Sequence, residues 1–270
     1  MSNRVHHLNC ATMCLAAAKV PGLAPERLVA HVLLVERPDG LTLVDGGLGS
    51  ADIQGGASRL GTVFVRGFGP RLALEETALH QVRVLGYEPS DVTDIVLTHL
   101  DVDHAGGIGD FPNARVHVHT VELAAALHPS IREKLRYVPT QWAHGPLWVE
   151  HAPKGDDWFG FSSVRAVGED ILLIPLHGHS RGHSGVAVRQ TNGHWLLHAG
   201  DAYFHSGDMD EPRRCPPFLR AFQSFVQMDA HARKQNLARL QSLRAEESAN
   251  VTVFCAHDQG EFDVLTAAND

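Results

Sequence analysis

Four side chains that can bind a metal ion lie within six consecutive residues of this chain. The segment HLDVDH supplies them as His99, Asp101, Asp103 and His104. It follows the apolar run 94–98 (DIVLT), which predicts a buried strand. Buried imidazoles and carboxylates are costly unless they are paired or bind a cation, and a divalent ion satisfies both their charge and their geometry. The segment therefore predicts a metal site at the end of the strand, and the Ala-Gly-Gly that follows lets the backbone turn closely around it.

Three later segments repeat the pattern of an apolar strand that ends in a possible metal ligand. LLIPLHGH ends at His179, WLLHAGD ends at Asp201, and VTVFCAH ends at His257. A single histidine after a strand is more often structural, but the agreement of several strand ends favours one shared site. His177 and His183 remain competing ligands beside His179. Three other histidines near Asp201 are expected to be structural or to support the ligands: His194, His198 and His205.

The elements that would position these residues follow from hydrophobic periodicity. Apolar runs at 31–36 and 41–45 flank Arg-Pro-Asp-Gly and predict a hairpin. A helix is predicted at 72–85, ended by Gly86, and another at 229–244. Further strands are predicted at 114–119, 170–176, 185–190, 194–199 and 251–256. Strands in both halves with helices between them indicate two sheets sandwiched by helices.

Two segments lack a clear period. Residues 137–161 carry several aromatic side chains, Trp142 among them, and are interpreted as a lid or insertion that lines an apolar acyl pocket. A satellite hydrophobic cluster under a long loop is the alternative. Residues 206–225 form a second irregular stretch with the same two interpretations.

Composition narrows the functional classes. The chain has 270 residues, a formal net charge of -8 and no basic run longer than Arg213 and Arg214, so nucleic acid is not an expected partner. The apolar patch 15–18 is too short for a signal peptide or a membrane span, so a cytoplasmic location with no membrane partner is expected. The four cysteines do not make a disulfide framework, and Cys255 is expected in the core. The unusual number is 19 histidines, because histidine is the commonest protein metal ligand.

The ordered motifs resemble those of the metallo-β-lactamase superfamily over nearly the whole chain: H-x-[HD]-x-D-H, then G-H-S-x-G, then G-D, then a late A-H-D. The resemblance implies one domain over 1–270 with an α/β (α+β) fold, an αββα sandwich of two mixed β-sheets flanked by helices. It implies two divalent ions, the first held by His99, Asp101 and His179, the second by Asp103, His104 and His257, with Asp201 bridging them. The segment LTLVDGGLG implies that Asp45 supports the metal ligands from behind.

Asp101 departs from the family pattern, because most relatives have histidine at this position. A carboxylate is a harder ligand and adds negative charge, so it shifts preference from zinc toward iron or manganese, or weakens the first site. Zinc is the expected metal, with iron or manganese as alternatives. The motif is also similar to H-x-E-x-D-H of flavodiiron proteins, which leaves a dinuclear iron oxidoreductase as a second enzyme class. A metal-binding sensor without turnover is the non-enzyme alternative.

The reaction expected first is the opening of a lactone or related ester by a metal-bound hydroxide. Chain length, motif and Tyr203 behind Asp201 resemble the N-acyl-homoserine-lactone lactonases, whose substrates are small acyl lactones. The resemblance implies that Tyr203 polarises the substrate carbonyl, although the local spacing is one residue shorter here. Asp103 is expected to pass a proton to the leaving alkoxide. A thioesterase of the hydroxyacylglutathione-hydrolase type is an alternative, and a homodimer is one option for assembly.

A serine hydrolase is a rival interpretation of the same residues. Gly178 to Gly182 also matches G-x-S-x-G, the nucleophile elbow of α/β-hydrolases, with Ser180 as nucleophile and Asp201 and His257 following in the required order. The elbow needs a strand, a sharp turn and a helix, whereas 185–189 followed by Asn-Gly indicates a strand entering a hairpin. This is the least favoured alternative.

Overall fold

The computed structural model describes residues 3–152 and 155–268, and contains two six-stranded sheets. In spatial order the first sheet contains β1 (Arg4–Met13), β2 (Leu28–Arg37), β3 (Gly40–Val44), β4 (Val92–Val96), β5 (Arg115–His119) and β6 (Leu147–His151). The second contains β12 (Val251–Phe254), β11 (Trp195–His198), β10 (Ser184–Arg189), β9 (Ile171–Pro175), β8 (Phe161–Val167) and β7 (Asp156–Trp158). Both sheets are mixed: β3 to β6 run parallel beside an antiparallel β1–β2–β3, and β11–β12 is a parallel pair beside antiparallel strands.

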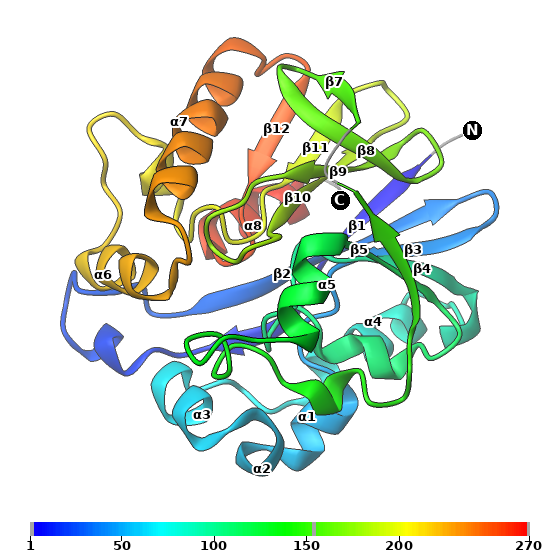
Figure 1. The fold of residues 1–270 in the computed structure, drawn as a ribbon, viewed down its shortest axis with the longest axis horizontal. Helices are drawn as coiled ribbons and strands as arrows, with labels where there is room; N and C mark the ends of the chain where they lie inside the picture. Colours follow the sequence, from blue (N-terminus) through cyan, green and yellow to red (C-terminus); the bar gives the residue numbers. More distant parts are fainter. Residues whose placement is uncertain (1–2, 153–154, 269–270) are drawn as a thin grey trace.

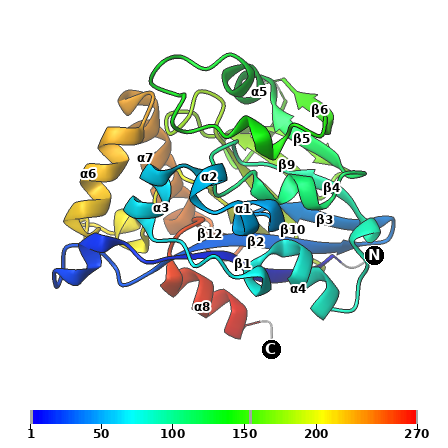
Figure 2. The ribbon, with the colours of Figure 1, turned by 90° about the horizontal axis from the view of Figure 1, so that it is seen from below.

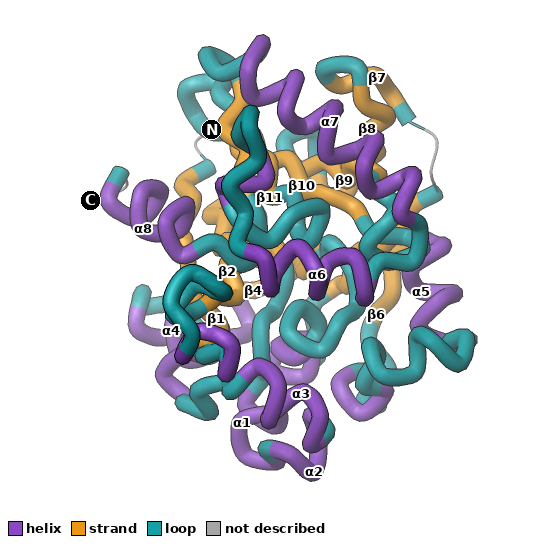
Figure 3. The backbone as a smooth tube through the Cα atoms, turned by 90° about the vertical axis from the view of Figure 1, so that its left-hand side faces the viewer, coloured by secondary structure: helices purple, strands orange, loops and turns teal. Residues whose placement is uncertain are grey.

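Helices cover the outer faces of the sheets. The first half contributes α1 (Ser50–Gly55), α2 (Ala57–Leu60), α3 (Thr62–Phe68), α4 (Ala78–Val84) and α5 (Thr120–Leu127). The second half contributes α6 (Pro217–Val226), α7 (Ala230–Glu246) and α8 (Gln259–Ala267). Figure 1 shows α7 on the opposite side of the molecule from α1 to α4, and Figure 3 shows α6 between α7 and the α1–α3 group. The helix α8 packs against β1 and β2 (Figure 2).

Successive side chains of a strand pack into different layers of the fold. In β2, Leu33 and Val35 pack between the two sheets, whereas Leu34 belongs to the cluster under the outer helices. This follows from the period of two in a strand, which sends successive side chains to opposite faces. In β9, Leu173 packs between the sheets and Ile174 packs under α7. The predicted sandwich of two mixed sheets flanked by helices is therefore confirmed.

The prediction of a lid at 137–161 is wrong for most of that segment, of which residues 153 and 154 lie outside the described part. Residues 147–151 form β6, which extends the first sheet by pairing with β5, and residues 156–158 form β7 beside β8. Trp142 is 7% exposed and lies in the core under the first sheet. The segment therefore contributes one strand to each sheet, and Tyr137, Trp142 and Trp158 supply core packing, whereas Phe159 is exposed.

Several element boundaries differ from the predicted ones. The helix expected from residue 72 begins only at Ala78, where the hydroxyl of Thr77 accepts from the N–H of His80 as an N-cap. The strand β1 and the helix α6 were not predicted from periodicity, because polar side chains interrupt the apolar pattern of both. All four cysteines are free, and Cys255 is fully buried as expected. Within the described residues, no helix has the length and apolar content needed to cross a bilayer.

Candidate metal centre

The predicted ligands follow the carboxyl ends of four strands. His99 to His104 come after β4, His179 lies between β9 and β10, Asp201 comes after β11, and His257 comes after β12. Parallel pairing of β11 with β12 places the last two at one edge, and parallel pairing of β3 with β4 does the same for Asp45 and the HLDVDH loop. The two edges meet, and the seven predicted ligands form two groups there, His99, Asp101, His179 and Asp201, and Asp103, His104 and His257.

The first group is spaced like the corners of a metal-binding tetrahedron. Asp101 Oδ2 lies 3.5 Å from His99 Nε2 and 3.0 Å from His179 Nε2. Asp201 Oδ2 lies 3.6 Å from His99 Nε2 and 3.3 Å from His179 Nε2. A tetrahedral ion with bonds of about 2.0 to 2.2 Å has ligand atoms roughly 3.3 to 3.6 Å apart. The first group therefore has the size that such an ion requires.

Asp201 also faces the second group, with its other carboxylate oxygen. Its Oδ1 lies 3.0 Å from His257 Nε2 and 3.4 Å from His104 Nε2. Asp103 is more distant, with Oδ2 3.8 Å from His257 Nε2 and Oδ1 4.0 Å from His104 Nε2. One carboxylate therefore presents one oxygen to each group, which is the arrangement that a bridging ligand needs.

Unpaired polar atoms at the cluster test whether it fits metal ions. Four buried atoms here have no hydrogen-bond partner: His99 Nε2, Asp101 Oδ1, His104 Nε2 and Asp201 Oδ1. A buried polar atom without a partner costs free energy, and native proteins rarely keep several together without a ligand. Imidazole nitrogens and carboxylate oxygens are the donors that zinc, iron and manganese accept. The cluster therefore fits divalent cations.

Asp45 lies behind two of the predicted ligands. It is 1% exposed and lies at a positive φ of 61°. Its Oδ2 accepts from His104 Nδ1 at 2.9 Å, and its Oδ1 accepts from the N–H of Thr98 at 2.7 Å. The Thr98 hydroxyl bonds Asp45 and also His99 Nδ1, at 2.9 Å. Asp45 therefore keeps the Nε2 lone pair of His104 directed at the cluster, and acts on His99 through Thr98.

Two glycines after the motif allow a close contact between two loops. A methyl group at Gly106 would collide with Asp52 Oδ2 and with the carbonyl of Gly47, and one at Gly107 would collide with the carbonyl of Gly46. Glycine at these positions lets the HLDVDH loop pack directly against the loop that follows Asp45.

Glu122, in α5, holds two ligand loops together and was not predicted. Its Oε1 accepts from the N–H of Leu100, and its Oε2 accepts from the N–H of Gly182 and the hydroxyl of Ser180, at 3.1, 3.0 and 2.6 Å. Ser180 is thus fully buried beside Glu122. The strand β10 follows its loop, where an elbow needs a helix. The serine-hydrolase alternative is therefore wrong.

Arg136 is a second residue that no motif pointed to. Its Nη1 donates to Asp101 Oδ2 at 2.7 Å and to His179 Nε2 at 2.8 Å, and its Nη2 donates to the Val226 carbonyl at 2.7 Å. Its side chain is 8% exposed. An arginine therefore reaches directly into the first group of ligands.

The charges of the cluster shift its pKa values. Burial raises the pKa of Asp101, but Arg136 and His99 outweigh it and hold that pKa well below its usual value. Burial, helped by Arg136, lowers the pKa of His179 to about 4, so its imidazole is neutral at pH 7 and can act as a ligand. Burial and His104 lower the pKa of His99, but Asp101 and Asp201 raise it to a net value of about 9. Protons therefore compete with any cation for His99.

Four of the other histidines near the ligands have structural partners. His183 bonds the Leu176 carbonyl through Nδ1 and accepts from the N–H of Asp201 through Nε2, so both of its nitrogens are used. His198 bonds the His31 carbonyl, and His194 bonds the Thr252 hydroxyl. His177 is outside both metal-binding groups. His205 Nδ1 accepts from the N–H of Gly207.

The expected role of Tyr203 is wrong. Its side chain is fully buried in the core of the second sheet, and its hydroxyl donates to Glu261 Oε1 at 3.0 Å. The next residue, Phe204, faces the ligands instead, with its ring centroid 5.7 Å from that of His179 and 5.2 Å from that of His257. The tyrosine hydroxyl is therefore directed away from the site.

An aromatic strip leads away from the cluster on the side of α3 and α6. Phe204 contacts Phe222 of α6, Phe222 contacts Phe68 of α3, and Phe68 stacks on Phe64, with centroids 5.8, 5.1 and 5.1 Å apart. These rings, and not the aromatic residues of 137–161, provide the apolar surface beside the ligands.

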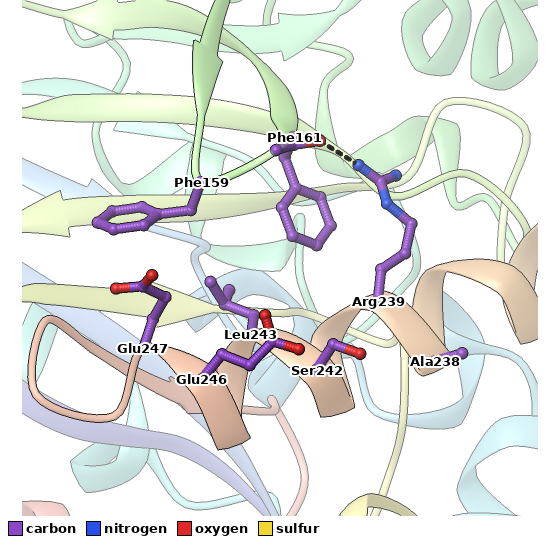
Figure 4. Close-up of a pocket in the computed structure, with 9 residues that line it drawn as sticks. Phe159, Phe161, Ala238, Arg239, Ser242, Leu243, Glu246 and Glu247 are labelled. Carbon is purple, nitrogen blue, oxygen red and sulfur yellow. Dashed lines mark hydrogen bonds between the residues drawn. The ribbon is translucent and has the colours of Figure 1, made fainter.

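A surface hollow of about 500 Å³ lies elsewhere, between the β7–β8 turn and α7 (Figure 4). Arg239 packs over the Phe161 ring at 4.0 Å and donates to the Gly160 carbonyl there. None of the predicted ligands lines this hollow.

Asp45→Asn is expected to lower the affinity for metal about 10- to 100-fold, the usual effect of removing the partner of a ligand. The new amide nitrogen would face His104 Nδ1, donor against donor, and favour the tautomer with a proton on Nε2. The measurement is competition with a chelating dye. Asp94→Asn is the control, because Asp94 also supports a buried histidine, His117 at 2.8 Å, outside the cluster. Equal affinities in all three proteins would contradict this role for Asp45.

Comparisons with known proteins agree with this geometry. The sequence model of the metallo-beta-lactamase superfamily matches residues 25–257. A probable metallo-hydrolase of Mycobacterium tuberculosis is 45% identical over 260 residues, which are 94% of this chain and 80% of that protein. The N-acyl homoserine lactonase AttM of Agrobacterium fabrum is 29% identical over 231 residues, covering 83% of this chain and 80% of that one.

Solved structures show the same fold. An N-acyl homoserine lactone hydrolase with N-hexanoyl-L-homoserine bound at its catalytic metal centre superposes with a TM-score of 0.74 at 22% identity, over 98% of this chain and 97% of that one. AidC, a dizinc quorum-quenching lactonase, gives 0.58 at 18% identity, over 86% and 74%. With its two mixed sheets, its cluster of histidine and aspartate ligands and these matches, the chain belongs to the metallo-β-lactamase superfamily.

Proposed function

We propose that this protein is a two-metal hydrolase that opens a lactone or a related ester. The observation that carries the proposal is the position of Asp201, whose Oδ1 faces one group of ligands and whose Oδ2 faces the other. Further support comes from the relatives named N-acyl homoserine lactonases. In the proposed assignment, His99, Asp101, His179 and Asp201 hold one ion, and Asp103, His104, His257 and Asp201 hold the other.

Two bound divalent ions would polarise the substrate carbonyl and lower the pKa of water toward ~7. The protein residues would then position the reactants and move protons. Asp103 is suited to the proton transfer, because its side chain remains 12% exposed while those of His104 and Asp201 are 1% and 4% exposed. Its carboxylate would take the proton of the attacking water and pass it to the leaving alkoxide.

Asp103→Asn is expected to fold normally but to lower kcat about 100-fold or more, because an amide cannot accept this proton. Metal content is measured on the same sample, since an amide oxygen can still act as a ligand. Tyr203→Phe is the matched control and should turn over at close to the wild-type rate, since its hydroxyl is buried against Glu261. Wild-type turnover by a fully loaded Asp103→Asn protein would exclude the role.

The aromatic strip gives this site a preference for substrates with an apolar chain. Phe204 lies against the ligands, and Phe222, Phe68 and Phe64 continue outward from it. Phe64, Phe68 and Phe222 are only partly buried, so they can gain apolar contact from a bound acyl chain. We infer that the acyl group of the substrate lies along this strip.

Phe222→Ala is expected to lower the ratio of kcat/KM for long-chain over short-chain lactones by roughly tenfold, which corresponds to a loss of about 1.4 kcal/mol of apolar contact. The control is Phe225→Ala. Phe225 lies in the same helix, but it is 78% exposed and outside the strip. The same change in both variants, or in neither, would argue against an acyl site here.

Removal of metal tests the function as a whole. Dialysis against a chelator should abolish hydrolysis of a panel of lactones, esters and thioesters, and one metal added back should restore it, with lactones turned over fastest. Hydrolysis that persists in protein shown to be metal-free would exclude the proposal. Fastest turnover of thioesters would favour the hydroxyacylglutathione-hydrolase type, and an iron absorption spectrum that changes between aerobic and anaerobic buffer would favour the oxidoreductase.

A further inference from the structure

Arg136 contacts only one of the two ligand groups. Its Nη1 bonds Asp101 Oδ2 and His179 Nε2, two of the four atoms of the first group. Within residues 3–152 and 155–268, no lysine or arginine makes a hydrogen bond or ion pair with Asp103, His104 or His257. The two groups are therefore alike in ligand chemistry but differ in the cation beside them.

The contacts of Arg136 use the atoms that a first ion would need. Arginine only donates hydrogen bonds, so its contact with His179 uses the lone pair of Nε2, whereas the 3.0 Å contact of the same nitrogen with Asp101 Oδ2 uses a proton on it. Either contact leaves no lone pair on Nε2 for an ion. The same conflict, in weaker form, exists at Asp101 Oδ2, which lies 3.0 Å from His179 Nε2 and 2.7 Å from the guanidinium.

Charge acts in the same direction. Asp101 adds a negative charge to the first group, and Arg136 pairs with it at 2.7 Å. An ion in the first group would lie within a few ångströms of a guanidinium that is mostly withdrawn from water, where repulsion between like charges is poorly screened. Binding there requires that Arg136 moves away or tolerates this repulsion.

We propose that Arg136 makes the centre asymmetric, so that the group of Asp103, His104 and His257 holds its ion tightly and the group of His99, Asp101 and His179 holds its ion weakly. This rests on the proposed two-metal function and refines it. Arg136 thereby acts as an internal cation that competes with the first ion. The protein then carries one resident ion and loads the other only when the metal concentration is high enough to displace the arginine.

The test is a titration of the metal-free protein with Zn²⁺ and, separately, with Co²⁺. Calorimetry measures the affinity for each ion, and the visible absorption spectrum monitors the binding of cobalt. Once loaded, wild type should retain one ion on dialysis against chelator-free buffer and bind the second roughly 10- to 100-fold more weakly, the range by which groups next to a ligand change affinity. Arg136→Gln should tighten the second ion by that factor. Arg136→Lys keeps the positive charge and should remain asymmetric.

Arg132→Gln is the matched control. Arg132 lies four residues earlier in the same segment and also bonds residues 225–227, through the carbonyls of Phe225 and Gln227, but it does not contact the ligands. The Arg132→Gln substitution should leave the affinities for both ions unchanged. Circular dichroism verifies that each variant is folded.

Two equally tight ions in wild type would overturn the proposal and leave the two-metal function intact, and this result needs no variant. An unchanged second affinity in Arg136→Gln, or the same tightening in Arg132→Gln, would also overturn it. A wild-type protein that binds neither metal would overturn both the asymmetry and the proposed function.

Discussion

Buried ligand atoms without a hydrogen-bond partner impose the main physical constraint on this structure. His99 Nε2, Asp101 Oδ1, His104 Nε2 and Asp201 Oδ1 are buried together and have no hydrogen-bond partner. Such a group is costly in a low-dielectric interior unless a cation is present. The surrounding residues keep it assembled, because each fixes a ligand through its other polar atom, as Asp45 fixes His104 and the Val29 carbonyl fixes His257.

The two sheets meet at this cluster and are tied together through it. The N–H of His31 in β2 donates to the carbonyl of Ala256 at 2.9 Å, and His257 Nδ1 bonds the carbonyl of Val29 at 2.8 Å. Glu122 makes the corresponding link between the loop after β4 and the loop after β9. Ligand geometry and the docking of the two sheets therefore depend on the same hydrogen bonds.

Much of this arrangement could be predicted because its signals are local. The motif HLDVDH and the three later strand ends lie in apolar runs that the sequence displays directly, and Asp45 follows its own strand. Arg136 and Glu122 could not be found in this way. Arg136 lies 35 residues from Asp101, and nothing in its neighbourhood resembles a ligand motif. Only the three-dimensional path of the chain brings it to the site.

The error at Tyr203 has a different origin. Tyr203 and Phe204 lie in a segment of turns and bends, where the tyrosine points into the core of the second sheet and the phenylalanine points toward the ligands. Phe204 therefore faces the ligands, and it has no hydroxyl to offer a carbonyl. Likewise, the aromatic residues of 137–161 are of the kind that line apolar pockets. Part of this segment instead forms β6, which pairs in the first sheet, and β7, which pairs in the second.

The division of the ligands between the two halves of the chain has a consequence for biosynthesis. Residues 99–104 leave the ribosome early, whereas the second group is complete only once His257 has emerged and β12 has paired beside β11. Stable capture of a metal ion by that group would therefore require translation through β12 and His257. A nascent protein stalled before β12 would expose an acidic, histidine-rich loop with no means of closing around its metal.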